Sequence, residues 1–380
     1  MTFLWLTRPA RQTRASSKRC RSTRLRVELL ESRELPSVAP QLLLVRPGDP
    51  HAFHTIQSAV NAAQPGDKIE IFGGTYKEAV KVSTAGLTLF GAPGSTTMIQ
   101  NPGGAMNGFT VGRPDGSSLD GFRLANVTVS GFLDDGVFLT GVTNFVLSHV
   151  ASRDNREYGL FPVLSSHGVI QYSTASGSND TGIYVGQSTN IVVQGNSVYN
   201  NTNGIEIENS TYVKAAFNTV HNNTVGILMD LLPGFPLAFE VSSHNLVTNN
   251  LVFNNNRHNT AQRGDIASVE PPGVGIAVVG GDHNVIRANL VLGNAFVGIV
   301  LLSGNDLLAL APPGTPAYPA GVDPNPNDTL VQFNVVLGNG FITSVPLGFP
   351  QPADLVWTGT GTGNHWKHNI FQTSTPSHLP

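Results

Sequence analysis

The sequence predicts an all-β fold: a right-handed parallel β-helix of three-strand rungs, about 22–23 residues each, with a short capping helix at its N-terminal end. Three observations lead to this prediction. Charged residues make up only 12% of the 380 residues, while 41 Gly and 25 Pro are present, a composition that disfavours long surface helices. The chain repeats with a period of 22 or 23 residues. Each copy holds short alternating runs of β-branched residues between Asn, Ser and Gly.

The first residues differ from the rest in charge. Residues 1–34 hold nine of the 22 basic but three of the 25 acidic side chains, so the net charge of −3 divides into +6 there and −9 beyond. An acidic body argues against a nucleic-acid surface, and no apolar run reaches the ~20 residues of a membrane span. We interpret residues 1–40 as a basic leader or disordered tether. It is an atypical leader, because its apolar stretch precedes the basic cluster.

Residues 54–63 predict the capping helix. Thr55 can serve as its N-cap, and a plug is needed because an open solenoid end exposes core and strand edges. The sequence Pro65-Gly66-Asp67 then predicts a turn before the first strands at 68–72. The apolar face that would plug the core consists of Ile56, Ala59, Val60 and Ala63.

A glycine opens each copy of the repeat. The spacings are 23, 23, 22, 22, 49 and 23, so the long interval holds two copies and an insertion. Equivalent residues of stacked rungs lie ~4.8 Å apart, so these glycines should form one column. We place the β-helix at residues 42–372 and a C-terminal tail at 373–380. The opening glycines are Gly136, Gly159, Gly182, Gly204, Gly226, Gly275 and Gly298.

Asparagine recurs in register with these glycines and predicts amide ladders that satisfy backbone groups from rung to rung. The column that defines the register is Asn196, Asn218, Asn250, Asn289 and Asn334. Histidine shows no comparable ligand spacing, and the single Cys20 excludes an intramolecular disulfide. We therefore assign no metal ligands.

With these repeats and the entry segment 54–76, the chain resembles the right-handed parallel β-helix repeat superfamily over roughly residues 42–372. That superfamily includes pectate lyases, polygalacturonases, alginate epimerases and NosD-like periplasmic proteins. The resemblance implies an exported protein, extracellular or in the cell envelope, that acts on or binds polysaccharide. Neither the Asp-Pro-His-Asp motif of alginate epimerases nor the Asn-Thr-Asp, Asp-Asp, Gly-His-Gly and Arg-Ile-Lys set of polygalacturonases occurs, so the resemblance does not select one activity.

Three insertions, at 231–240, 257–273 and 303–328, indicate a walled groove. Positions one and three after each opening glycine are apolar and should point inward, so positions two and four should point outward. The apolar outward positions of the C-terminal rungs should be covered by the insertions: Ala277, Val279, Val300 and Leu302. The first outward column reads Phe138, Phe161, Tyr184, Glu206 and Leu228, and the second Thr140, Val163, Gly186, Glu208 and Asp230.

The aromatic part of the first column predicts sugar binding. Phe138, Phe161 and Tyr184 would offer ring faces on which sugars stack, unless a loop or residues 1–40 cover them. Arg156 and Lys214 are further candidate substrate-binding residues, as cations for an acidic sugar.

The carboxylates that follow are the candidate catalytic residues. Glu206 and Glu208 lie on one side of one strand, and Asp230 falls one rung on, ~5 Å away. Such proximity should raise at least one pKa. These acids could be catalytic or substrate-binding, could hold Ca²⁺, or could be solvated surface acids. Asp180 is a fourth candidate, or else a turn acid like Asp134 and Glu157 in earlier rungs.

Two functions follow. The first is a polysaccharide lyase, epimerase or hydrolase; a hydrolase would use Glu206 or Glu208 as acid and Asp230 or Asp180 as base. A lyase or epimerase would need a base and a cation, from Tyr184, Arg153, Arg156 or Lys214 with Ca²⁺ on the acids. The alternative is a non-catalytic polysaccharide-binding protein. Copper delivery is disfavoured by scarce Cys and Met. No cofactor is required, Ca²⁺ is the candidate, and no oligomeric state is indicated.

Overall fold

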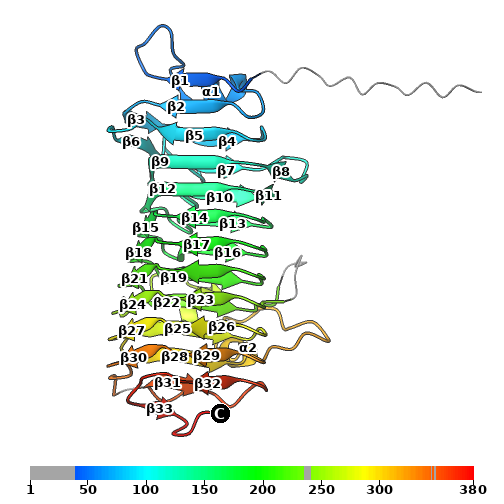
Figure 1. Cartoon of the computed structure of the whole chain (residues 1–380), viewed down its shortest axis with the longest axis vertical. Coiled ribbons are helices and arrows are strands. Elements are labelled where there is room, and N and C mark those ends of the chain that lie inside the picture. Colours follow the sequence, from blue (N-terminus) through cyan, green and yellow to red (C-terminus); the bar gives the residue numbers. More distant parts are fainter. Residues whose placement is uncertain (1–38, 235–240, 344, 346–347) are drawn as a thin grey trace, which may run out of the picture. The chain divides into compact units, whose positions relative to one another are not determined.

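Successive turns of the chain stack as parallel rungs, confirming the right-handed parallel β-helix (Figure 1). The computed structural model describes residues 39–234, 241–343, 345 and 348–380. Each strand pairs with its equivalent one turn later, as β10 (Val137–Thr140) does with β13 (Leu160–Val163) through Phe138 and Phe161. The predicted leader, 1–40, lies outside the described residues except for its last two.

The strands form three parallel sheets in the described residues. The 11-stranded sheet, which carries the predicted site, consists of β4 (Val80–Val82), β7 (Phe109–Val111), β10, β13, β16 (Thr181–Gly186), β19 (Asn203–Glu208), β22 (Val225–Asp230), β25 (Val274–Val279), β28 (Val297–Leu302), β31 (Ala353–Trp357) and β33 (Ser374–Thr375). The two-stranded sheet consists of β8 (Leu119–Asp120) and β11 (Val142–Thr143).

The 20-stranded sheet holds the other two strands of most rungs. Its strands are β1 (Leu42–Val45), β2 (Lys68–Ile71), β3 (Gly74–Lys77), β5 (Thr88–Gly91), β6 (Thr97–Gln100), β9 (Arg123–Ser130), β12 (Val146–Arg153), β14 (Val169–Gln171), β15 (Thr174–Ser176), β17 (Val192–Gln194), β18 (Ser197–Tyr199), β20 (Lys214–Ala216), β21 (Thr219–His221), β23 (Leu246–Thr248), β24 (Leu251–Phe253), β26 (Val285–Arg287), β27 (Leu290–Leu292), β29 (Leu330–Gln332), β30 (Val335–Leu337) and β32 (His365–Lys367).

The N-terminal end is closed as predicted. Helix α1 (Ile56–Ala62) begins after Thr55, whose side chain accepts a hydrogen bond from the Ser58 amide at 3.1 Å. Its apolar face is buried against the first rungs. Two other helical segments, α2 (Gly304–Leu308) and the 3₁₀ turn η1 (Ile266–Val269), lie in the insertions.

The predicted glycine column and amide ladder are both present. A Cβ on Gly204 would overlap the carbonyl oxygen of Gly226 in the next rung, so only glycine allows this approach. In the ladder, the Asn218 side chain accepts from the Asn196 amide and donates to Asn250 Oδ1, both at 3.0 Å. A second ladder ends on Asp354, which accepts from the amide and side chain of Asn339.

The inward and outward pattern also holds. Positions one and three after the glycines are buried inside the rungs, as Ile205 and Ile207 show. The insertions cover the C-terminal rungs: Ala277, Val279 and Val300 pack with Ile266 and Val269 in a second apolar cluster. The pairing continues into the segment set apart as a tail, because β33 pairs with β31. In the described residues no helix is long and apolar enough to cross a membrane.

Candidate functional site

Three adjacent strands of the 11-stranded sheet bring the predicted acids together. Strand register places Glu206 of β19 beside Tyr184 of β16, and Glu208 beside Asp230 of β22. Ligand oxygens of Glu206, Glu208 and Asp230 all lie within 4.8 Å of one another. We call these three residues the acid cluster. The expected proximity is therefore present in the structure.

The acid cluster is more enclosed than the sequence indicated. Glu206 is 6% exposed and Asp230 only 1%, while Glu208 is half-buried. Of the alternatives for these outward acids, solvated surface acids do not fit this burial. The insertion at 257–273 brings Glu270 to the cluster, and Asn203 Nδ2 donates to both Glu206 and Glu270 at 3.3 Å. The insertions have turned part of an outer face into an interior.

Hydrogen bonds satisfy the cluster only in part. Glu206 accepts from the Thr181 hydroxyl, and Glu208 accepts from Gln187 Nε2 at 2.9 Å. Both carboxylate oxygens of Asp230 are buried without a hydrogen-bond partner, and so are Glu270 Oε2 and Asn203 Oδ1. Buried acceptors of this kind are rare in folded proteins and call for a ligand or a proton.

Burial raises the pKa of Glu206, Glu208, Asp230 and Glu270. For Glu206 and Asp230, loss of hydration is the first cause of the raised pKa, and neighbouring carboxylates are the second. The pKa of Glu270 is raised in the same way. For Glu208, burial raises the pKa while hydrogen bonds from Tyr184 and Gln187 oppose the change.

A polar cavity of about 210 Å³ adjoins the acid cluster, because its lining residue Asp180 and Glu206 both accept hydrogen bonds from the Thr181 hydroxyl. Arg156 lies at its rim and donates to Gln262 Oε1 of the insertion at 3.0 Å. Burial raises the pKa of Asp180 to about 7, against a hydrogen bond from Thr181. Loss of hydration and the neighbouring Asp134 raise the pKa of Glu157 to about 8. The cavity is lined by Arg156, Glu157, Asn179, Asp180, Gln262 and Asp265.

The aromatic side chains that were predicted to bind sugar pack on one another in the structure. Tyr184 is only 6% exposed, because Tyr158 and Phe161 pack on it with ring centroids 4.8 and 4.7 Å away. Phe138 and Phe161 are half-buried and contact each other at 5.2 Å. The rings stack mutually along the column, so the prediction of an uncovered sugar-stacking stripe is wrong at Tyr184.

The two predicted cationic residues lie at different places in the fold. Arg156 joins the cavity, but Lys214 lies exposed on β20 in the 20-stranded sheet. The turn after β19 carries the chain from one sheet to the other within six residues, so nearness in sequence to Glu208 did not mean nearness in space. Lys214 does not join the acids on their sheet.

Several residues of the site were missed by sequence reasoning. Glu270, Gln262 and Asp265 belong to an insertion without periodicity, which gives no register from which to place them. Tyr158 and Asn203 precede the opening glycines by one residue, a column that also contains Asp135 and Thr181. Comparing that column could have found them.

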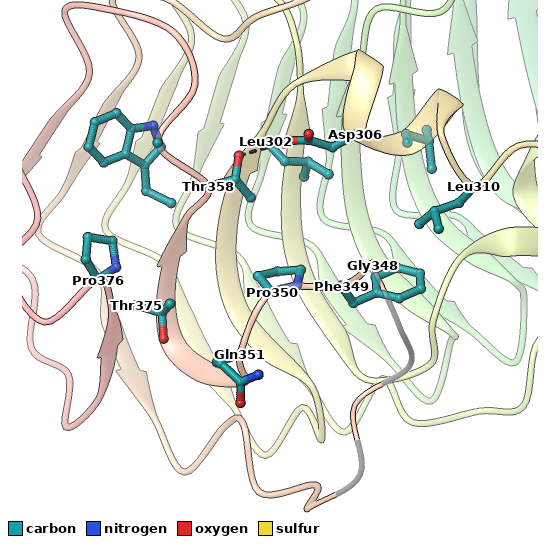
Figure 2. Close-up of a pocket in the computed structure, with 13 residues that line it drawn as sticks. Leu302, Asp306, Leu310, Gly348, Phe349, Pro350, Gln351, Thr358, Thr375 and Pro376 are labelled. Atoms are coloured by element: carbon teal, nitrogen blue, oxygen red, sulfur yellow. Dashed lines mark hydrogen bonds between the residues drawn. The ribbon is translucent and has the colours of Figure 1, made fainter.

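Another cavity lies away from the acid cluster. A space of about 540 Å³ lies at the C-terminal rungs, between α2, β28 and β31 (Figure 2). Its acid, Asp306, already accepts a hydrogen bond from the Thr358 hydroxyl at 3.0 Å and caps α2. None of the predicted site residues lines this mostly apolar cavity.

Comparison with known proteins identifies the family. The family model described as "Periplasmic copper-binding protein (NosD)" matches residues 75–270, just over half of the chain. The chain belongs to the NosD family. That family is described as periplasmic, in line with the expected export. No curated protein matches this NosD-family chain in sequence.

Solved structures show the fold shared with carbohydrate-active enzymes. The A-module of mannuronan C-5 epimerase AlgE4 from Azotobacter vinelandii is 16% identical, with 84% of this chain and 92% of that chain covered and a TM-score of 0.57. DFA-IIIase from Arthrobacter chlorophenolicus A6, without its lid and in complex with GF2, is 12% identical, with 88% and 90% covered and a TM-score of 0.58. At these identities the likeness concerns the fold alone.

The described residues of this NosD-family protein do not fit copper. Copper prefers imidazole nitrogen and soft sulfur ligands. Met229 is buried inside the rungs, and Cys20 lies outside the described residues. His244 and His283 lie on neighbouring rungs with ring centroids 5.0 Å apart and ring planes tilted by 42°. The one group of three or more potential metal ligands in the described residues contains no histidine. The acid cluster offers only oxygen, which suits hard cations.

Proposed function

We propose that this NosD-family protein is exported and acts on a glycan at the polar cavity, with Asp180 and Glu157 as its acid–base pair. The observation that carries the proposal is the cavity itself: carboxyl, amide and guanidinium groups converge on one space next to the acid cluster. Sugar hydroxyls donate and accept hydrogen bonds, so they suit such a mixed lining. At about 210 Å³ the space is below the 300–1,000 Å³ typical of drug-sized ligands and suits a single sugar ring.

The charge of the site favours a neutral glycan over a uronate. Three carboxylates and one guanidinium line the cavity, and the acid cluster lies next to it. An acidic sugar would be repelled unless a cation intervened. This favours hydrolysis over lyase or epimerase chemistry, because those reactions abstract a proton beside a carboxylate that needs neutralising.

Asp180 and Glu157 suit the two roles of hydrolysis. They occupy equivalent turn positions in adjacent rungs, with the Asp180 amide donating to the Glu157 carbonyl at 3.3 Å. The protonated carboxyl would give its proton to the glycosidic oxygen as the C1–O bond breaks. The ionised carboxylate would accept a proton from the water that forms the new C1–O bond. A pKa of about 7 for Asp180 and about 8 for Glu157 allows one proton to be shared near neutral pH.

The test is incubation with a panel of neutral and acidic polysaccharides, reading reducing ends and unsaturated-product absorbance. We expect new reducing ends without unsaturated products, lost by about 10²-fold or more in Asp180→Asn with substrate affinity little changed. Asp120→Asn, an exposed acid on β8, is the control. Binding without turnover would support the non-catalytic alternative, unsaturated products would identify a lyase, and the absence of both binding and turnover would refute the proposal.

A further inference from the structure

The geometry points to a Ca²⁺ site formed by Glu206, Glu208, Asp230 and Glu270, which ties the insertion at 257–273 to β19 and β22. This inference goes beyond the proposed function and does not depend on it, since the glycan cavity and the acid cluster use different residues. The juxtaposition that carries it is the set of ligand oxygens of Glu206, Glu208 and Asp230, which lie within 4.8 Å of one another on two adjacent strands. Glu270 of the insertion is joined to this set because Asn203 Nδ2 donates to both Glu206 and Glu270.

Asp230 provides evidence for a bound cation that the clustering of acids alone does not provide. Its side chain is 1% exposed and lies within 4.8 Å of both Glu206 and Glu208, yet neither of its oxygens has a hydrogen-bond partner. Glu270 Oε2 and Asn203 Oδ1 are unpartnered too. All four free atoms are acceptors, so what is missing is positive charge or donated protons. A bound cation would supply the positive charge.

Protein cations do not fill this role in the described residues. The ion pairs there are Arg46–Asp49 and His283–Asp328, neither of which involves the cluster. Two arginines of this region form other hydrogen bonds: Arg156 at the polar cavity donates to Gln262, and Arg257 of the insertion donates to Thr260. Carboxylates buried without a countercharge are costly, so an external cation is the simplest complement.

The ligand set selects the cation. Carboxylate and amide oxygens are hard donors, which favours Ca²⁺ or Mg²⁺ over copper. Four carboxylates and the Asn203 amide oxygen could provide the six to eight oxygens that Ca²⁺ accepts, some of them bidentate. Mg²⁺ demands a tight octahedron and retains several waters. A crowded, largely dehydrated cluster therefore favours Ca²⁺.

The position of Glu270 means that a bound cation would hold the insertion at 257–273 against the sheet. Glu270 directly follows η1, and Asn259 Nδ2 holds this corner of the insertion by donating to the carbonyls of Ala267 and Glu270 at 2.7 and 2.9 Å. A cation between Glu270 and the sheet would fasten the whole insertion. Gln262 and Asp265 of the same insertion line the polar cavity, so Ca²⁺ would also fix one wall of that cavity.

Terbium binding tests the site without reference to activity. Tyr184 lies beside Glu206 on the adjacent rung, so excitation of tyrosine should sensitise Tb³⁺ luminescence in chelator-treated protein. We expect Ca²⁺ to quench it by displacement, and to slow tryptic cleavage at Arg257 and Arg263 in the insertion. Asp230→Asn and Glu270→Gln should weaken Tb³⁺ and Ca²⁺ binding at least about 10-fold, whereas the exposed Asp115→Asn should not.

Each outcome decides the inference. Circular dichroism establishes that the variants fold, and Glu208→Gln serves if Asp230→Asn does not. Absence of sensitised luminescence, or no protection of the insertion by Ca²⁺ at millimolar concentration, would overturn it. Equal protection by Mg²⁺ would overturn the choice of Ca²⁺. Glycan binding of chelator-treated protein is measured separately, so failure of this site and failure of the proposed function are distinguishable.

Discussion

Replacing Asp135 by asparagine should stabilise the protein, and increasingly so as the pH rises. Asp135 is 3% exposed and its Oδ1 has no hydrogen-bond partner. Burial first, and then the charges of Asp134 and Glu157, raise the pKa of this carboxyl from 3.8 to about 8, against a hydrogen bond from the Tyr158 amide. Asparagine keeps the oxygen that accepts from Tyr158 and places an uncharged amide beside the two carboxylates.

The sign and size follow from proton linkage. Between pH 3.8 and about 8 the folded state keeps a proton that the unfolded state has lost, so the free energy of unfolding falls as pH rises. Each pH unit in this window amounts to about 1.4 kcal/mol. The cost of Asp135 is then roughly 1.5 kcal/mol at pH 5 and roughly 4 kcal/mol at pH 7. Asp135→Asn should recover most of it.

Chemical denaturation at pH 5 and pH 7 measures the effect. The gain in unfolding free energy should grow by about 2.5 kcal/mol between the two pH values. Asp120 is the control of opposite sign: hydrogen bonds from Asn144 and Thr143 lower the pKa of this exposed carboxyl, so Asp120→Asn should destabilise at pH 7 and less at low pH. A gain for Asp135→Asn that is absent or independent of pH would refute the reasoning.

Three further variants test the fold and the site. Asn218→Ala removes hydrogen bonds to Val193 and Asn250 and from Asn196, and should cost roughly 3–5 kcal/mol in denaturation, whereas the exposed Asn305→Ala on α2 should cost little. Gly204→Ala should cost more than about 3 kcal/mol, because its Cβ has no room between rungs. Lys214→Ala should leave glycan affinity unchanged, since Lys214 belongs to another sheet; weakened binding would contradict the placement.

The repeat explains why so much of the fold could be predicted. Stacking makes each rung repeat the environment of the last, so a glycine required by close approach, as at Gly204, recurs at a fixed interval in the sequence. Asn218 shows the same for side chains, since its partners are the equivalent asparagines above and below. The proximity of Glu206, Glu208 and Asp230 followed from this register alone.

What could not be predicted depends on chain outside the repeat. Glu270 reaches the acid cluster through an insertion whose path follows no period. The burial of Tyr184 depends on Tyr158 and on the space over Gly186, which admits the ring because glycine has no side chain. The alternation of residues along a strand correctly gives the side to which each side chain points. Whether that side is exposed to solvent depends on which other segments of the chain cover it.

In the columns of the 11-stranded sheet, apolar residues follow the acids, so packing alone does not require carboxylates at the acid positions. Glu206 is followed in its column by Leu228, Ala277 and Val300, and Asp230 is followed by Val279. In those later rungs apolar residues pack beneath the insertions and form a dry cluster. The same sheet and the same cover would accept apolar residues at the acid positions as well. Carboxylates buried there instead lower stability relative to an available packing solution. The proposed cation site would account for their presence, whereas the packing of this face alone does not require them.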